Sequence, residues 1–120
     1  MQFSDLSPRA QVALTKNGSS IIGEREARLL DAVDRVRSIK DAAAEAGISY
    51  RTAWSAIQQM ERALGRPIVV SRAGGQGGGA TTLTDECRQL LTRYRDLRRR
   101  LEDALMQAWV PAPEPAPAGD

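Results

Sequence analysis

The feature that most constrains the fold is a pair of helical segments separated by a very short turn. Ser38 precedes "IKDAAAEAG", and Ser49 precedes "YRTAWSAIQQMERALG". A serine hydroxyl can cap the free amides at a helix start, and a glycine suits the left-handed position at a helix end. Only Gly47 and Ile48 separate the first helix from the cap of the second. This spacing predicts a helix-turn-helix.

The segments around this pair complete a recognisable pattern. Apolar residues at helical spacing predict an amphipathic helix over 24–36, and "AQVALTKNG" predicts a short strand that ends in an Asn-Gly turn. "PIVVSR" and "TTL" predict a hairpin with a glycine-rich tip. Residues expected to face inward from the short helix are Ile39, Ala42, Ala43 and Ala46.

We therefore expect a mainly α protein with a small β wing. A winged helix-turn-helix domain is predicted over residues 1–83, and a long helix follows over 84–109. The Pro/Ala-rich residues 110–120 are expected to form a disordered tail.

Five glycines crowd the predicted hairpin tip, between Gly74 and Gly79. A P-loop would need Lys and Ser/Thr next, but Ala80 and Thr81 follow. Gly75, Gly77 and Ala80 match the dinucleotide pattern, yet that motif requires a βαβ unit, and no second parallel strand follows. An enzyme that binds a nucleotide here is thus the weakest hypothesis. A wing that touches DNA is favoured, with Arg72 and Gln76 as donors.

Composition argues against catalysis and metal binding. The chain has no histidine and one cysteine, so it lacks the commonest general base and the usual zinc ligands. We expect no enzyme activity, no metal and no cofactor. No apolar run approaches the roughly 18 residues of a membrane span. The N-terminus does not resemble a secretory signal, and the single cysteine fits a cytoplasmic protein.

Charge is unevenly distributed along the chain. Between Arg66 and Arg100, eight arginines stand against Asp85, Glu86 and Asp96. Such a basic region favours a polyanionic partner, although an ordinary solvated face is the alternative.

The predicted third helix has two distinct faces. Ala53, Ile57, Met60 and Leu64 form an apolar stripe, and the opposite side carries hydrogen-bonding groups without a carboxylate: Arg51, Ser55, Gln58 and Arg62. These side chains can read base edges in double-stranded DNA, and an ordinary polar surface is the alternative. Ser49 suits a phosphate, Tyr50 can reach one, and Trp54 is expected to seal the edge of the core.

Apolar residues continue into the last helix at alternating steps of four and three. This 3.5-residue period is typical of a coiled-coil seam, so we expect a homodimer. The predicted dimer residues are Leu83, Cys87, Leu90, Tyr94, Leu97, Leu101 and Leu105. Cys87 is interpreted as a buried apolar residue and not a nucleophile. The alternative is a protein–protein module whose long helix pairs with a different subunit.

Several stretches together resemble the N-terminal winged-helix domain of the ModE family of molybdate-dependent transcriptional regulators, which is itself similar to the LysR-type DNA-binding domain. They are "GEREARLLDAV", "SIKDAAAEAGISYRTAWSAIQQM", "SRAGGQGGGATTLT" and "LLTRYRDLRRRLEDAL", and the resemblance covers approximately residues 11–108. Two departures are Cys87 and Arg37, each standing where the family usually has glycine.

The resemblance implies a dimer whose third helix enters the major groove, with dimerisation through the first and last helices. It adds Thr52 and the Gly74–Gly79 loop to the predicted contacts. The full predicted DNA-contacting set is Ser38, Ser49, Tyr50, Arg51, Thr52, Ser55, Gln58, Arg62, Arg72, Gly75, Gln76 and Gly77. ModE proteins also carry C-terminal molybdate-binding domains, whereas this sequence ends in the proline-rich tail. The expectation is that either a separate partner senses molybdate or the domain binds DNA without that input.

Overall fold

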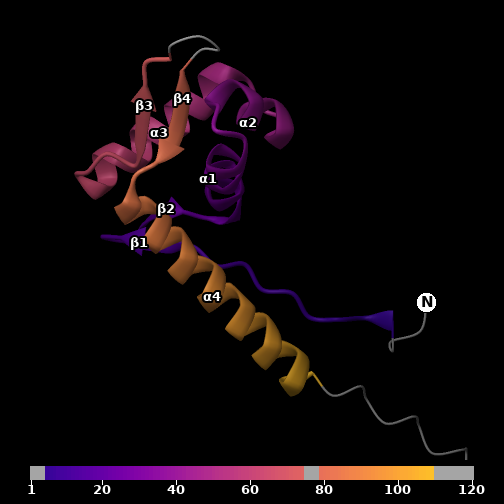
Figure 1. The fold of residues 1–120 in the computed structure, drawn as a ribbon. Helices are drawn as coiled ribbons and strands as arrows, with labels where there is room; N and C mark the ends of the chain where they lie inside the picture. Colours follow the sequence, from indigo (N-terminus) through magenta and orange to yellow (C-terminus); the bar gives the residue numbers. More distant parts are fainter. Residues whose placement is uncertain (1–4, 75–78, 110–120) are drawn as a thin grey trace, which may run out of the picture.

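A computed structural model describes residues 5–74 and 79–109 (Figure 1). The elements follow the order β1 (Leu14–Lys16), β2 (Ser19–Ile22), α1 (Glu24–Val36), α2 (Ile39–Ala46), α3 (Tyr50–Leu64), β3 (Val69–Arg72), β4 (Ala80–Leu83) and α4 (Asp85–Ala108). The first three helices and the β3–β4 hairpin gather at one end of the molecule, and α4 extends away from them. The mainly α winged helix-turn-helix with a long last helix is confirmed. The predicted tail, 110–120, lies outside the described residues.

The predicted caps determine where the helices begin and end. The Ser38 hydroxyl accepts a hydrogen bond from the Asp41 amide at 3.1 Å, and the Ser49 hydroxyl accepts one from the Thr52 amide at 3.0 Å. Gly47 ends α2 in the left-handed conformation, with φ of 72°. These bonds satisfy backbone groups that a helix end leaves free. The bounds of α1, α2 and α3 therefore match the sequence-based prediction.

Small side chains let the first three helices pack closely. Ala42, Ala43 and Ala53 are almost completely buried, and Val33 and Ile57 lie in the same core. Ala46 was also expected to face inward, but it is exposed in the last turn of α2. The core therefore contacts only the first two turns of this short helix.

The N-terminal region forms a hairpin, where only one strand and a turn were predicted. Asn17 and Gly18 both have positive φ, 53° and 82°, as a type I′ hairpin turn requires. The returning strand β2 escaped prediction because it begins with two exposed serines. The Lys16 ammonium donates to the Ala63 carbonyl at 2.9 Å, which attaches the hairpin to the end of α3.

The predicted wing is an antiparallel hairpin of β3 and β4, in which Val69 is paired with Leu83 and Arg72 with Ala80. Two backbone contacts anchor it. The Glu61 carboxylate accepts from the Ile68 amide at 2.9 Å, and the Thr81 amide donates to the Arg37 carbonyl at 3.1 Å. The wing is thus attached both to α3 and to the turn between α1 and α2.

The first half of α4 belongs to the core of its own chain. Cys87 and Tyr94 of α4 and Leu83 at the end of β4, three of the predicted dimer residues, are each at most 3% exposed. The Tyr94 hydroxyl also donates to the Val12 carbonyl at 2.8 Å. These three side chains therefore offer almost no surface to a second chain, which corrects the predicted seam. The apolar period was right, but its first half is used within the monomer.

The second half of α4 is different. Leu97 and Leu101 are 41% and 39% exposed, and Leu105 is half-buried, whereas Leu90, in the first half, packs partly buried against the core. The N-terminal segment runs beside this part of the helix (Figure 1), where the Trp109 indole donates to the Leu6 carbonyl at 3.0 Å. Within residues 5–74 and 79–109, no helix is long and apolar enough to cross a membrane.

Candidate nucleic-acid interface

The two predicted faces of α3 are separated as the sequence pattern indicates. Ala53, Ile57 and Met60 are at most 2% exposed and form the core side. We call the opposite side the outer face of α3; its residues Arg51, Ser55, Gln58 and Arg62 are all exposed.

The carboxylate of α3 is turned away from the outer face. Glu61 lies next to Arg62 in sequence, but its side chain is half-buried and accepts the hydrogen bond from the Ile68 amide. This role of Glu61 has no local sequence signal, because its partner is seven residues away in the loop before the wing. The outer face is consequently free of negative charge, which favours approach to phosphate.

The start of α3 presents hydroxyl groups that are already organised. The Ser49 hydroxyl donates to the Thr52 hydroxyl at 2.9 Å while it caps the helix, and both residues are exposed. Tyr50 is 55% exposed and meets Trp54 edge to face, with ring centroids 6.3 Å apart. Trp54 packs partly buried against the core, as predicted for a residue that seals its edge.

Ser38 occupies the equivalent position at the start of α2. Its hydroxyl caps that helix and its side chain is half-buried. The structure therefore gives Ser38 a structural role in the described chain, and a contact to DNA stays a prediction.

On the wing, Arg72 is exposed at the end of β3. At Gly79 an added Cβ would lie 2.5 Å from the Arg72 carbonyl oxygen, so the return of the hairpin requires a residue without a side chain. Gly75, Gln76 and Gly77, the predicted contacts at the tip, lie outside the described residues.

The arginines of α4 are largely paired with carboxylates. Arg88 contacts Asp34 at 3.0 Å, Arg95 contacts Asp31, and Arg98 lies 3.2 Å from Glu24. All three carboxylates belong to α1, so these pairs hold α4 against α1. Further along α4, Arg99 and Arg100 both contact Asp96. The basic region predicted from residues 66–100 is therefore mostly neutralised within the chain.

The arginines of α3 and the wing are not paired in this way. Across the ranges that the structure describes, Arg51, Arg62 and Arg72 have no carboxylate oxygen within 4.0 Å. Their positive charge remains available to a partner.

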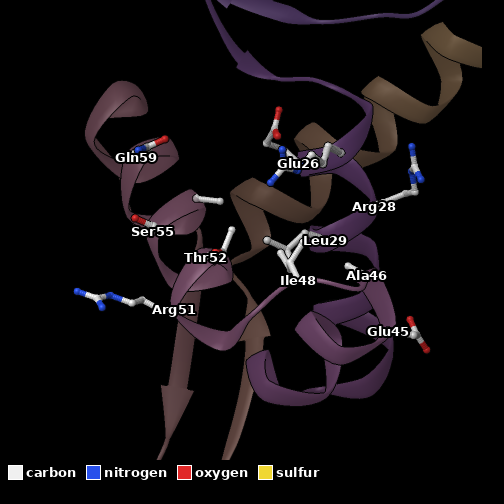
Figure 2. A pocket seen from close by; sticks show the side chains of 12 residues that line it. Glu26, Arg28, Leu29, Glu45, Ala46, Ile48, Arg51, Thr52, Ser55 and Gln59 are labelled. Atoms are coloured by element: carbon white, nitrogen blue, oxygen red, sulfur yellow. The ribbon is translucent and has the colours of Figure 1, made fainter.

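A pocket between α1, α2 and α3 lies beside the outer face (Figure 2). Leu29 and Ile48 point towards each other within it, and Arg51 extends away from α1. The lining mixes arginines with Glu26 and Glu45, and the Arg35 guanidinium, 2.5 Å from Glu45, holds the pKa of that carboxyl below its usual value. The pocket therefore carries side chains of both charges beside the outer face.

Cys87 is unsuited to nucleophilic chemistry. The thiol is buried, and burial, together with the charge of Asp34, raises its pKa to about 11. It is therefore a neutral thiol near pH 7, and packing is its role in the described chain.

The geometry of the outer face of α3 suits double-stranded DNA, whose base edges offer hydrogen-bonding groups in the major groove. An α-helix fits the major groove of B-DNA, and arginine and glutamine side chains pair with guanine and adenine there. The exposed, carboxylate-free outer face of α3 suits the bases, and the exposed Arg72 of the wing suits the backbone, as in a winged helix that contacts both.

Comparison with known proteins supports the same conclusion. Residues 25–88 match the family described as "Bacterial regulatory helix-turn-helix protein, lysR family". "Molybdenum transport protein ModE" of Azotobacter vinelandii is 38% identical over 96 residues, which are 80% of this chain and 36% of that protein. "Molybdenum-pterin-binding protein MopA" of Rhodobacter capsulatus is 34% identical over 109 residues, 89% of this chain and 41% of that protein.

A third relative, "DNA-binding transcriptional dual regulator ModE" of Escherichia coli K12, is 42% identical over 71 residues, 58% of this chain and 27% of that protein. The chain thus spans less than half the length of these curated relatives. The resemblance to the ModE N-terminal region is confirmed. Because the family match covers more than half of the chain and includes α2, α3 and both wing strands, the chain belongs to the lysR family of bacterial regulatory helix-turn-helix proteins.

Proposed function

We propose that this chain is a sequence-specific, DNA-binding transcriptional regulator that acts as a homodimer in molybdate-linked gene control. The observation that carries the proposal is the outer face of α3, which is exposed and free of carboxylates in a lysR-family fold whose wing exposes Arg72. α3 would enter the major groove, with Arg51 towards guanine, Gln58 towards adenine and Ser55 towards either base.

The remaining predicted contacts would hold the DNA backbone. Ser49, Thr52 and Tyr50 lie exposed at the start of α3, where a phosphate is favoured by hydroxyl donors and by the helix dipole. Arg72 would bind a phosphate from the wing. These contacts supply affinity and orientation, and the outer face supplies sequence preference.

The direct test is retention of mixed genomic DNA fragments on the immobilised chain at increasing salt. Neutralised phosphates release counterions, so the logarithm of the affinity should fall linearly with the logarithm of the salt concentration. Sequencing of the retained fragments should reveal an enriched motif. Lack of retention at low salt would contradict DNA binding and favour a protein–protein module.

A second test of DNA binding uses the wing. Arg72→Ala should weaken binding to the enriched site and to unrelated duplexes alike, because a phosphate contact carries no sequence information. A loss confined to the enriched site would contradict a backbone role for Arg72.

The second half of α4 supports the homodimer. A helix of 24 residues is about 36 Å long, and its outer part exposes Leu97 and Leu101 with Met106, Trp109 and the nearby Leu6. Pairing two such helices would bury these side chains. It would also hold two copies of α3 together, so that they meet half-sites separated by roughly 34 Å or a multiple of it.

Light scattering tests this dimer. Leu97→Asp should halve the mass of the particle, since it places a charge in an apolar seam. Gln107→Asp, at an exposed polar position of the same half of α4, serves as the control and should leave the mass unchanged. An unchanged mass for Leu97→Asp would refute the seam. A monomeric unaltered chain would favour the alternative, in which α4 pairs with a different subunit.

The link to molybdate rests on the names of the relatives. Fragments enriched by the chain should include regions upstream of molybdenum transport genes, and the experiment is run with and without molybdate. We propose that a separate partner carries any molybdate signal. Molybdate alone should then leave the DNA affinity of the purified chain unchanged; a change would place the sensor in this chain.

A further inference from the structure

The turn between α1 and α2 contains an unusual residue. Arg37 ends α1 with φ of 60° and ψ of 34°, in the left-handed region, and its amide donates to the Val33 carbonyl at 2.8 Å. A side chain with a Cβ disfavours this conformation, whereas glycine adopts it freely. An arginine in this strained backbone conformation is therefore a candidate for a functional side chain.

The backbone of Arg37 is attached to the wing. Its carbonyl accepts the hydrogen bond from the Thr81 amide, and Thr81 is paired with Ser71 across the hairpin. β3, β4 and Arg37 therefore follow one another across the wing, next to its last paired residues, Arg72 and Ala80. Arg37 and Arg72 belong to the segments on the two opposite sides of β4.

The neighbouring charges leave Arg37 available. It is exposed, and in residues 5–74 and 79–109 no carboxylate oxygen lies within 4.0 Å of its guanidinium. Of the charged residues within three positions, Arg35 pairs with Glu45, Asp34 pairs with Arg88, and Lys40 has the same sign as Arg37. The next residue is Ser38, which begins α2.

We propose that Arg37 is a DNA backbone contact, which binds a phosphate on the side of the wing opposite to Arg72. This inference rests on the proposed function and deepens it. A guanidinium matches a phosphate with two parallel hydrogen bonds, and the Thr81–Arg37 bond holds its backbone in place. The contact lies between two parts of the predicted interface, the wing and Ser38 at the start of α2.

The test compares Arg37→Gly, Arg37→Lys and a control, Arg93→Ala. Glycine relieves the left-handed backbone, so the variant should melt no lower than the unaltered chain. Its dissociation constant should nevertheless rise several-fold for specific and mixed duplexes alike. The slope of log affinity against log salt should shrink by about one for each chain bound. Arg37→Lys keeps the charge and should keep the slope.

Arg93 is an exposed arginine of α4, and Arg93→Ala should leave both affinity and slope unchanged. An unchanged slope for Arg37→Gly would overturn the inference, as would a slope for Arg37→Lys as small as that of the glycine variant. If Arg51→Ala loses specific binding while Arg37→Gly binds normally, only this inference fails. If the unaltered chain shows no salt-dependent DNA binding, the proposed function fails first and the inference fails with it.

Discussion

Helices α3 and α4 both display arginines, yet the structure uses these side chains in different ways. On α4, Arg88, Arg95 and Arg98 are placed against carboxylates of α1. On α3, Arg51 and Arg62 have no such partner among the described residues. The helix with more arginines is thus the one in which most of them are already paired, Arg93 being the exception among its described arginines.

This contrast shows that pairing, more than the number of arginines, locates a surface for a polyanion. Exposed ion pairs contribute only about 0.2–1 kcal/mol each to stability. They nevertheless cancel the local field, so a paired arginine attracts phosphate less than an unpaired one. The comparison assigns the first half of α4 to the fold and α3 to recognition.

The largest expected effect tests whether the first half of α4 belongs to the core. Leu91 is 3% exposed in the first half of α4, so Leu91→Ala should lower the free energy of unfolding by about 2–5 kcal/mol. Leu101→Ala, in the exposed second half, should cost much less when the chain is diluted to the monomer, because only pairing with a second chain would bury Leu101. Urea denaturation measures both, and equal losses would contradict the division of α4 into two halves.

The assignment of α3 to DNA recognition is tested by matched arginine variants on α3 and α4. Arg51→Ala should weaken binding to the enriched DNA site by about 1–3 kcal/mol, while binding to unrelated duplexes changes little. Arg95→Ala removes the same charge from α4 and should leave both affinities nearly unaltered, because Asp31 already neutralises it. Fluorescence anisotropy with labelled duplexes measures the four values. Comparable losses of DNA affinity from the two variants would contradict the distinction between the unpaired arginines of α3 and the paired arginines of α4.

Glu61 sharpens the comparison within α3 itself. Glu61→Ala should lower the free energy of unfolding by about 1–2 kcal/mol, because the Ile68 amide loses its acceptor. Gln58→Ala, on the outer face, should leave unfolding unaffected and weaken specific DNA binding instead. Thermal melting and anisotropy separate the two effects, and a DNA defect in a fully stable Glu61→Ala would reassign that residue to the interface.

The smallest effect concerns the pairing on α4. Asp31→Asn should release Arg95 and raise non-specific affinity at low salt by at most about fivefold, given the small free energy of an exposed pair. Asp103→Asn makes the same change in net charge at an exposed position of α4 and should raise the affinity less. Equal increases would attribute the effect to net charge and not to the freed guanidinium.

The helices were predictable because their signals are local. Ser38, Ser49 and Gly47 act on backbone groups within a few residues, and the apolar spacing of α3 directly separates its core side from its outer face. The exposure of Arg51 and Gln58 followed from the same spacing. Local hydrogen bonds and helical periodicity therefore established these elements without knowledge of the rest of the chain.

Other features depended on partners far away in sequence. The 3.5-residue period of α4 predicted an apolar seam but could not tell whether a second chain or the chain's own core covers it. Tyr94 is buried because its hydroxyl reaches Val12, 82 residues away, and Arg88 is paired because α1 brings Asp34 to it. Neither contact has a signature in the neighbouring sequence.

By itself, then, the sequence determined the helix bounds, the caps, the wing strands and the family resemblance, because short-range backbone chemistry and periodicity control them. Only the tertiary structure decided which arginines are free, which half of α4 is core, and that Arg37 is joined to the wing through Thr81. Burial and charge pairing are properties of packed surfaces, and those surfaces exist only after distant segments have come together.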